Sequence, residues 1–244
     1  MQQDHVPSIG VRMWTVVMIA SVFGSTVGDF LSAHLALGFM IRLLLLAAVV
    51  GLIFAGEARD RSKSQAWYWM AVVTIQAAAT KLSDFLTIDL GLGRLQIIVG
   101  ISMLLVVMAV IVRSGEKFVI SQHMVARPGA MAKPMTDATH WIGMVVSSIV
   151  GSVASEFMAI GLGAGPVGAA AILAMLLAAS FWLHRRPGID LLMVFWVTGA
   201  LIRATSTTFG DLLAKTVGLS LGALLTGSLL IALLVLWRQP RSHA

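Results

Sequence analysis

The sequence contains no cysteine and few charged residues. Without a thiol, the chain has no disulfide, thiolate metal site or cysteine nucleophile. Charged residues fill only 11% of the 244 positions and hydrophobic residues fill 58%, a balance that a water-soluble domain of this size does not sustain. The sequence also lacks a nucleotide-binding motif, a catalytic nucleophile and a His/Asp or metal-ligand cluster. We therefore expect an integral membrane protein that is not an enzyme and holds no resident cofactor.

Positive charge is concentrated in one set of loops. The net charge is +6, but 12 of the 17 basic residues lie in polar segments on one predicted side of the membrane. The positive-inside rule explains this distribution, so we expect no nucleic-acid partner and place both termini in the cytoplasm. The first twelve residues are polar and hold one basic residue, which argues against a cleaved signal peptide.

Eight apolar runs, each close to the ~20 residues that cross a bilayer, predict eight transmembrane helices. They cover residues 13–33, 38–56, 67–88, 92–112, 141–160, 164–183, 190–214 and 217–237. Short glycine-containing turns join the two runs of each successive pair, which predicts four helical hairpins. The expected fold class is all-α.

An internal repeat relates the four hairpins. Each contains an acidic residue 15 positions after a tryptophan, and successive acids are separated by 55, 72 and 55 residues. The acids are Asp29, Asp84, Glu156 and Asp211, and the tryptophans are Trp14, Trp69, Trp141 and Trp196. Because each unit has an even number of spans, all four point the same way across the membrane, in a pseudo-fourfold or two-by-two arrangement. We expect the tryptophans to anchor the units at the membrane interface.

The chain is expected to form a single membrane domain over residues 1–244. The repeats cover residues 13–56, 67–113, 140–184 and 190–237. The longest loop, residues 114–139, contains two prolines and a glycine, and we expect it to be a cytoplasmic connection between two halves of four helices each.

A polar stripe precedes each acid. Hydroxyl residues stand four positions before the acids, namely Ser25, Thr80, Ser152 and Thr207. Polar or basic residues stand eight positions before them, namely Ser21, Gln76, Ser148 and Arg203. Positions four apart share one helix face, so we expect the first helix of each hairpin to line a central cavity. Small residues five positions before the acids, such as Gly24 and Gly151, favour close helix approach around the stripe.

The tryptophan-led two-span unit with its acidic motif resembles a known family. Motifs such as Thr26-Val27-Gly28-Asp29-Phe30-Leu31 and Ser83-Asp84-Phe85-Leu86 are similar to those of the bacterial uncharacterised membrane-anchored proteins, which consist of four such repeats. The resemblance covers residues 13–237, and the third repeat departs from it with Glu156 followed by Phe157-Met158. It implies an eight-span protein of the bacterial inner membrane, and it implies no particular activity.

The four acids point to an ion site inside the membrane. An ionised carboxylate in the hydrocarbon region costs about 2.5 to 3.5 kcal/mol on insertion scales unless it is paired, solvated or protonated. Sites rich in oxygen suit hard cations. We therefore expect the acids and the hydroxyl residues four positions before them to bind a small inorganic cation, with the four acids as ligands where the ion is a metal. Because carboxylates exchange a proton for an ion, we expect a proton-coupled secondary exporter whose partners are membrane lipid, a cation and protons.

Other polar residues are expected to balance charge or to gate the path. Lys81 and Arg203, with Gln76 in the same stripes, are candidates for charge balance near the acids. Lys81 is equally well explained as a structural partner of Asp84 or Asp89, and Arg203 as the partner of a single acid. His34 and Asp89 share the position five residues after the acid and form a candidate entrance or proton relay.

Three other functions remain open from the sequence. A passive cation channel needs a continuous polar path. The residues twelve positions before the acids are apolar and argue against such a path; they are Val17, Val72, Met144 and Gly199. An organic-cation or drug exporter needs aromatic walls, for which Phe30, Phe85 and Phe157 are candidates. A non-transporting scaffold or sensor would use the four acids only as structural contacts that all four repeats inherited.

Overall fold

A computed structural model describes Pro7 and residues 10–35, 38–60, 64–114, 138–183 and 191–237. Within these ranges the chain contains helices and no strand. The α-helices are α1 (Val11–His34), α2 (Phe39–Arg59), α3 (Ala66–Asp84), α4 (Arg94–Ser114), α6 (Ala138–Glu156), α7 (Gly165–Leu183), α8 (Leu191–Val217) and α9 (Leu219–Leu236). Two π-helical turns, η2 (Phe85–Asp89) and η3 (Phe157–Gly161), extend α3 and α6. The predicted all-α class is confirmed.

Five helices are long and apolar enough to cross a membrane. They are α1, α2, the continuous segment Ala138–Gly161, α7 and α9, and a shorter apolar stretch covers Arg94–Met108 in α4. Such a set is what a helical membrane protein requires. The central part of the predicted loop 114–139 lies outside the described residues.

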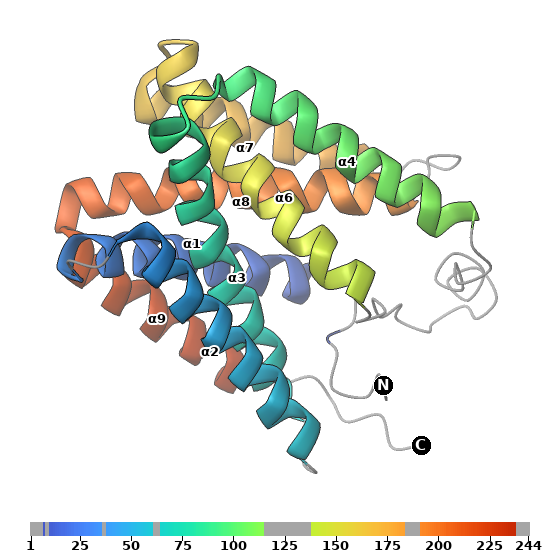
Figure 1. Ribbon diagram of the computed structural model, residues 1–244, viewed down its shortest axis with the longest axis vertical. Helices are drawn as coiled ribbons and strands as arrows, with labels where there is room; N and C mark the ends of the chain where they lie inside the picture. Colours follow the sequence, from blue (N-terminus) through green and yellow to red (C-terminus); the bar gives the residue numbers. More distant parts are fainter. Residues whose placement is uncertain are drawn as a thin grey trace.

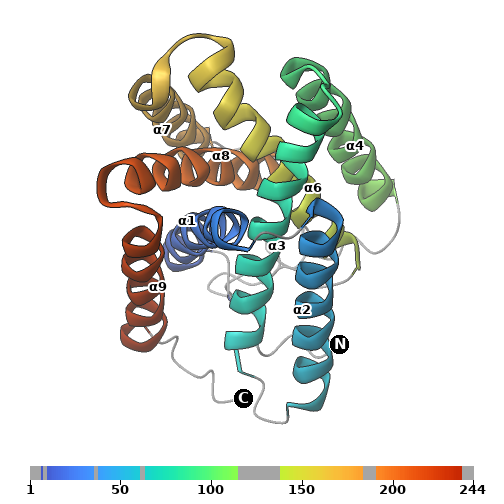
Figure 2. The same ribbon diagram turned by 60° about the vertical axis from the view of Figure 1, so that its left-hand side comes forward.

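Four helices form a closed inner ring. Helix α1 packs against α3 and α8, and α6 also packs against α3 and α8, so that each inner helix has two inner neighbours. The inner helices are inclined to one another; in Figure 2, α3 stands upright while α8 lies across the view. These four helices carry the acids and the polar stripes.

Each outer helix packs against the inner helix that follows it in the chain. Thus α2 packs on α3, α4 on α6, and α7 on α8. The last helix, α9, closes the circle by packing on α1, beside which it lies in Figure 1. The side chain of Arg12 at the start of α1 strengthens this closure, because its Nε donates to the carbonyl of Trp237 at the end of α9.

Small residues bring the inner helices into backbone contact. A Cβ added at Gly24 would lie 2.6 Å from the carbonyl oxygen of Val73 on α3. A Cβ added at Gly151 would lie 2.8 Å from the backbone nitrogen of Ala204 on α8. Both distances are shorter than a side chain tolerates, so the prediction that small residues at these positions permit close approach is confirmed.

Aromatic and aliphatic residues fill the ring at the end where α1 and α3 begin. Trp14 and Trp69 belong to this hydrophobic cluster with Met13, Tyr68 and Val72, and Trp69 is only 1% exposed. The expectation that the repeated tryptophans are interfacial anchors is therefore wrong for these two. Their size makes them better fillers of a space where four helices meet than of a lipid-facing surface.

Glycines in the left-handed region end the hairpin turns. Gly91, Gly163 and Gly218 have φ angles of 64°, 66° and 88°, and each lies seven residues after an acid. A side chain is strained at these angles, which explains why glycine stands there. These three turns fix the positions of Asp84, Glu156 and Asp211 relative to the turns of their hairpins.

Candidate ion site

The four predicted acids lie at the same level of the four inner helices. Asp29 and Asp211 lie within α1 and α8, whereas Asp84 and Glu156 are the last α-helical residues before η2 and η3. A π-turn widens the helix by one residue and is frequent at functional sites. The second and third repeats thus differ locally from the first and fourth.

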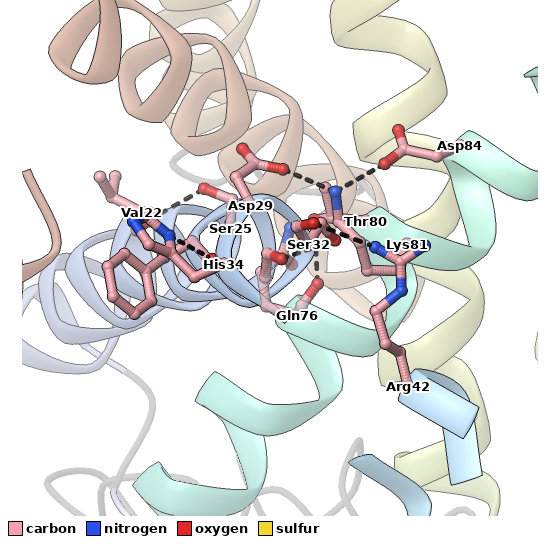
Figure 3. A network of polar contacts seen from close by, with 12 residues as sticks. Val22, Ser25, Asp29, Ser32, His34, Arg42, Gln76, Thr80, Lys81 and Asp84 are labelled. Carbon is pink, nitrogen blue, oxygen red and sulfur yellow. Dashed lines mark hydrogen bonds and ion pairs between the residues drawn. The ribbon is translucent and has the colours of Figure 1, made fainter. Parts of the chain in front are cut away.

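Lys81 joins two of the acids. Its Nζ donates to Asp29 Oδ1 at 2.7 Å and to Asp84 Oδ2 at 2.6 Å, and Figure 3 shows the nitrogen between the two carboxylates. The Lys81 side chain is only 10% exposed. The lysine therefore turns toward the acids. Its pair with Asp84 agrees with both predicted roles, its pair with Asp29 with charge balance among the acids, and Asp89 is not a partner.

Arg94 holds the third acid. Its Nε lies 3.0 Å from Glu156 Oε2, and the two side chains are 32% and 22% exposed. Sequence reasoning missed this pair. The available signal was a basic residue at the start of α4, on the predicted side of the membrane where the sequence places few positive charges.

The fourth acid differs from the other three in its contacts. Asp211 makes no ion pair or hydrogen bond with the described residues. It stands at the same repeat position on α8 as Asp29 on α1 and Glu156 on α6, and α8 packs against both of these helices. The four carboxylates therefore converge at one end of the ring, and one of them has no direct cationic partner in the described part of the chain.

Within the described residues, no three His, Cys, Asp or Glu side chains stand close enough to hold a metal ion together. Lys81 and Arg94 occupy the carboxylate oxygens instead. A cation shared among Asp29, Asp84, Glu156 and Asp211 would thus have to displace these ammonium and guanidinium groups or bind beside Asp211.

The hydroxyl residues of the stripes are all buried. Ser25, Thr80, Ser152 and Thr207 are between 1% and 6% exposed. Ser25, Thr80 and Thr207 donate to carbonyls of their own helices, and a hydroxyl oxygen that donates can still accept a hydrogen bond. Ser152 Oγ has no hydrogen-bond partner among the residues that the structure describes.

Gln76 and Arg203 meet across the ring. Arg203 donates from one terminal nitrogen to Gln76 Oε1 at 2.7 Å, and Gln76 Nε2 lies 3.5 Å from Thr207 Oγ1. The two residues are 0% and 1% exposed, so side chains fill the ring axis at this level instead of lining the expected open cavity. The expectation that Arg203 pairs with an acid is wrong, because the acids lie eight residues, or about 12 Å, further along the helices.

His34 and Asp89 do not join the site. Both are exposed, and the described structure shows no contact between either residue and the four acids. His34 Nδ1 lies 3.0 Å from the carbonyl of Phe30, and its ring stacks on the Phe30 ring at 4.1 Å. The expected entrance or relay built from these two side chains is therefore not assembled here.

Two further features border the site. Val17, Val72 and Met144 are buried in one hydrophobic cluster on the far side of Arg203 from the acids, and they separate the polar layers from that end of the ring. A pocket beside Lys81 is lined by Gly28, Ser32 and Arg42 together with leucines of α1 and α2, so it lies on the flank of the ring rather than on its axis.

Comparison with known proteins identifies no relative of this chain. No protein-family model, no curated protein and no solved structure matches the chain. The resemblance based on the tryptophan-led hairpins stays a prediction, and the function has to be inferred from the site.

Proposed function

We propose that this protein transports a small inorganic cation across the bacterial inner membrane by proton-coupled secondary export. In this proposal the chain spans the membrane eight times as four like-oriented hairpin repeats, with both termini in the cytoplasm. The five apolar helices and the closed order of helix contacts support that arrangement. The acids then lie toward the outer face and the Val17, Val72 and Met144 layer toward the cytoplasm.

The observation that carries the proposal is the position of Asp211. It stands at the same repeat position as three other carboxylates on the packed inner helices, and it makes no ion pair with the described residues. Clustered negative charge attracts a cation or retains a proton, because each lowers the repulsion among the carboxylates. Asp211 is therefore the acid at which we place exchange of a proton for the transported ion.

Lys81 acts in this proposal as an internal cation. Its ammonium already bridges Asp29 and Asp84, as a bound monovalent ion would. An arriving cation competes with it for the carboxylate oxygens, and the hydroxyls of Ser25 and Thr80 lie one helical turn deeper to complete the ion's coordination. Transport then requires the apolar layer to open after the outer end closes.

The packing of the ring favours an exchanger over a passive channel. Gln76 and Arg203 fill the axis, and the apolar layer interrupts the polar path. An organic-cation exporter needs aromatic side chains that line its cavity. Phe85 does not support this function, because its ring stacks on that of Phe39 of α2 at 4.2 Å between ring centres.

A non-transporting scaffold is the second candidate. The ion pairs of Asp29, Asp84 and Glu156 favour it, because paired acids fix helix positions without any ligand. The two functions differ at Asp211, for which a scaffold has no evident use.

A thermal-shift screen of purified protein separates them. Mono- and divalent cations are added across a range of pH to the wild type and to D29N/D84N/E156Q/D211N. Transport predicts that at least one cation raises the Tm of the wild type but not of the variant, because a ligand that binds only the folded state stabilises it. A folded wild type that no cation stabilises supports the scaffold.

A further inference from the structure

The two halves of the ring repeat each other's helix contacts. A shift of 127 residues carries Asp29 to Glu156 and Asp84 to Asp211, and with them the α1–α3 pair of helices to the α6–α8 pair. The outer helices follow the same rule, because α2 packs on α3 as α7 packs on α8, and α4 packs on α6 as α9 packs on α1. Contacts in one half therefore indicate where the equivalent groups of the other half lie.

The α1–α3 and α6–α8 interfaces also share one register. A Cβ added at Gly24 would lie 2.6 Å from the carbonyl oxygen of Val73, and one added at Gly151 would lie 2.9 Å from the carbonyl oxygen of Ala200. These are equivalent atoms after the shift of 127 residues. The acids of α1 and α6 lie five residues, or about 7.5 Å, further along these helices. The acid layers of the two interfaces are therefore directly comparable.

The two interfaces differ at one position of the acid layer, where α3 has a lysine and α8 has a threonine. The ammonium of Lys81 bonds to Asp29 at 2.7 Å and to Asp84 at 2.6 Å. Thr208 takes the place of Lys81 on α8, and its Oγ1 lies 2.6 Å from Ser155 Oγ on α6. A threonine brings oxygen but no charge to this place. The cation that joins the acids of the first interface thus has no counterpart at this position of the second.

Arg94 supplies only part of the missing charge. Its Nε donates to Glu156 Oε2 at 3.0 Å, whereas Asp211 has no ion pair with the described residues, and Lys215 one turn further along α8 is exposed. Two acids and one contacting base leave one negative charge between α6 and α8. Ser152, four positions before Glu156 on the same helix face, is 1% exposed, and its Oγ has no hydrogen-bond partner within the described part of the chain. This half of the acid layer is therefore short of one positive charge.

We propose that a monovalent inorganic cation binds between α6 and α8, at the place that the Lys81 ammonium takes between α1 and α3. Its ligands are the carboxylates of Glu156 and Asp211 and the hydroxyls of Thr208 and Ser155. One positive charge neutralises the acid that has no base, whereas a divalent ion would leave an excess charge inside the membrane. The inference rests on the proposed transport function and names its substrate class. The ion binds in this half without displacing Lys81.

The test moves the lysine of the first half into the second. Wild type and T208K are melted in the chlorides of sodium, potassium, magnesium and N-methylglucamine at equal ionic strength. We expect sodium or potassium, but not magnesium, to raise the Tm of the wild type above its value in N-methylglucamine in a saturable way. T208K should have the higher Tm of the two proteins in N-methylglucamine and should not respond to sodium or potassium, because its own ammonium takes the place of the ion.

A matched control is T216K, which adds the same charge at an exposed threonine of α8 and should keep the response of the wild type. An unchanged response in T208K overturns the site. If T208K does not fold, T208V decides, because it removes only the hydroxyl ligand. The sodium or potassium concentration needed for half of the effect should then rise about tenfold, as expected for loss of one good bond to a charged group, and an unchanged concentration overturns the site.

Failure of this inference can be told apart from failure of the transport proposal. Stabilisation of the wild type by magnesium alone overturns the monovalent site and leaves cation transport standing. A wild type that none of the cations stabilises contradicts both.

Discussion

The ammonium nitrogen of Lys81 lies 2.7 Å from Asp29 Oδ1, so one buried lysine of α3 is bonded to a neighbouring helix of the ring. The same nitrogen lies 2.6 Å from Asp84 on its own helix. One cation thus holds together two carboxylates that would otherwise repel each other at the α1–α3 contact. The pairing belongs to the fold whether or not the site carries ions.

Replacing Lys81 by methionine should lower the free energy of unfolding by about 2 kcal/mol, because two partly buried acids lose their counter-ion. The measurement is the Tm in detergent. K215M is the matched control, since Lys215 is exposed and makes no ion pair within the described chain. Adding D29N to K81M should recover part of the loss; a double variant less stable than K81M would contradict the repulsion argument.

A methyl group at the ring contact should be more harmful than one on the outer surface. G24A forces a Cβ to within 2.6 Å of the Val73 carbonyl and should cost about 1 to 3 kcal/mol of stability. G100A, in α4, meets nothing within 4 Å and should be neutral or stabilising, because alanine favours a helix over glycine. Equal Tm changes in the two variants would show that α1 and α3 do not approach this closely.

The hydrophobic end of the ring should depend on its buried tryptophans. W69A removes a side chain that is 1% exposed and should cost about 3 to 5 kcal/mol by leaving a cavity. W182A removes one that is 55% exposed and should change stability by no more than about 0.5 kcal/mol. A larger loss of stability in W182A than in W69A would contradict this prediction and favour the view that tryptophan acts chiefly at the membrane interface.

The absence of native cysteine permits a direct test of topology. Single cysteines are placed by L92C, in the turn after η2, and by S64C, just before α3. If α3 spans the membrane with cytoplasmic termini, a membrane-impermeant maleimide labels L92C in intact cells and labels S64C only after lysis. Labelling of both from the same side would remove α3 as a span and the eight-span arrangement with it.

Sequence periodicity predicted the parts of the fold that depend on one helix at a time. The apolar runs located the eight α-helices of the described residues, and the four-residue spacing placed Gln76 and Arg203 on buried faces. Such features follow from helix geometry alone. The inward turn of Lys81 was one of two arrangements that the spacing allowed.

The contacts between helices could not be predicted from a single sequence. The bond between Arg203 and Gln76 joins residues 127 positions apart, and the pair of Arg94 and Glu156 joins residues 62 apart. A hairpin pattern also does not reveal that α2 packs on the next repeat's inner helix. The burial of Trp69 depends on the same tertiary arrangement, because a tryptophan near a helix end suits either lipid headgroups or a packed core.

The most direct test of the cation-transport proposal is flux through D211N in proteoliposomes. The protein is reconstituted with a pH-sensitive dye inside, and cations that raise its Tm are added outside. The proposal predicts cation-driven proton movement in the wild type and in E57Q, a control at the opposite end of α2 from the acids, and a loss of at least about tenfold in D211N, as expected when a group that exchanges the proton is removed. Undiminished flux in a folded D211N would contradict the proposal.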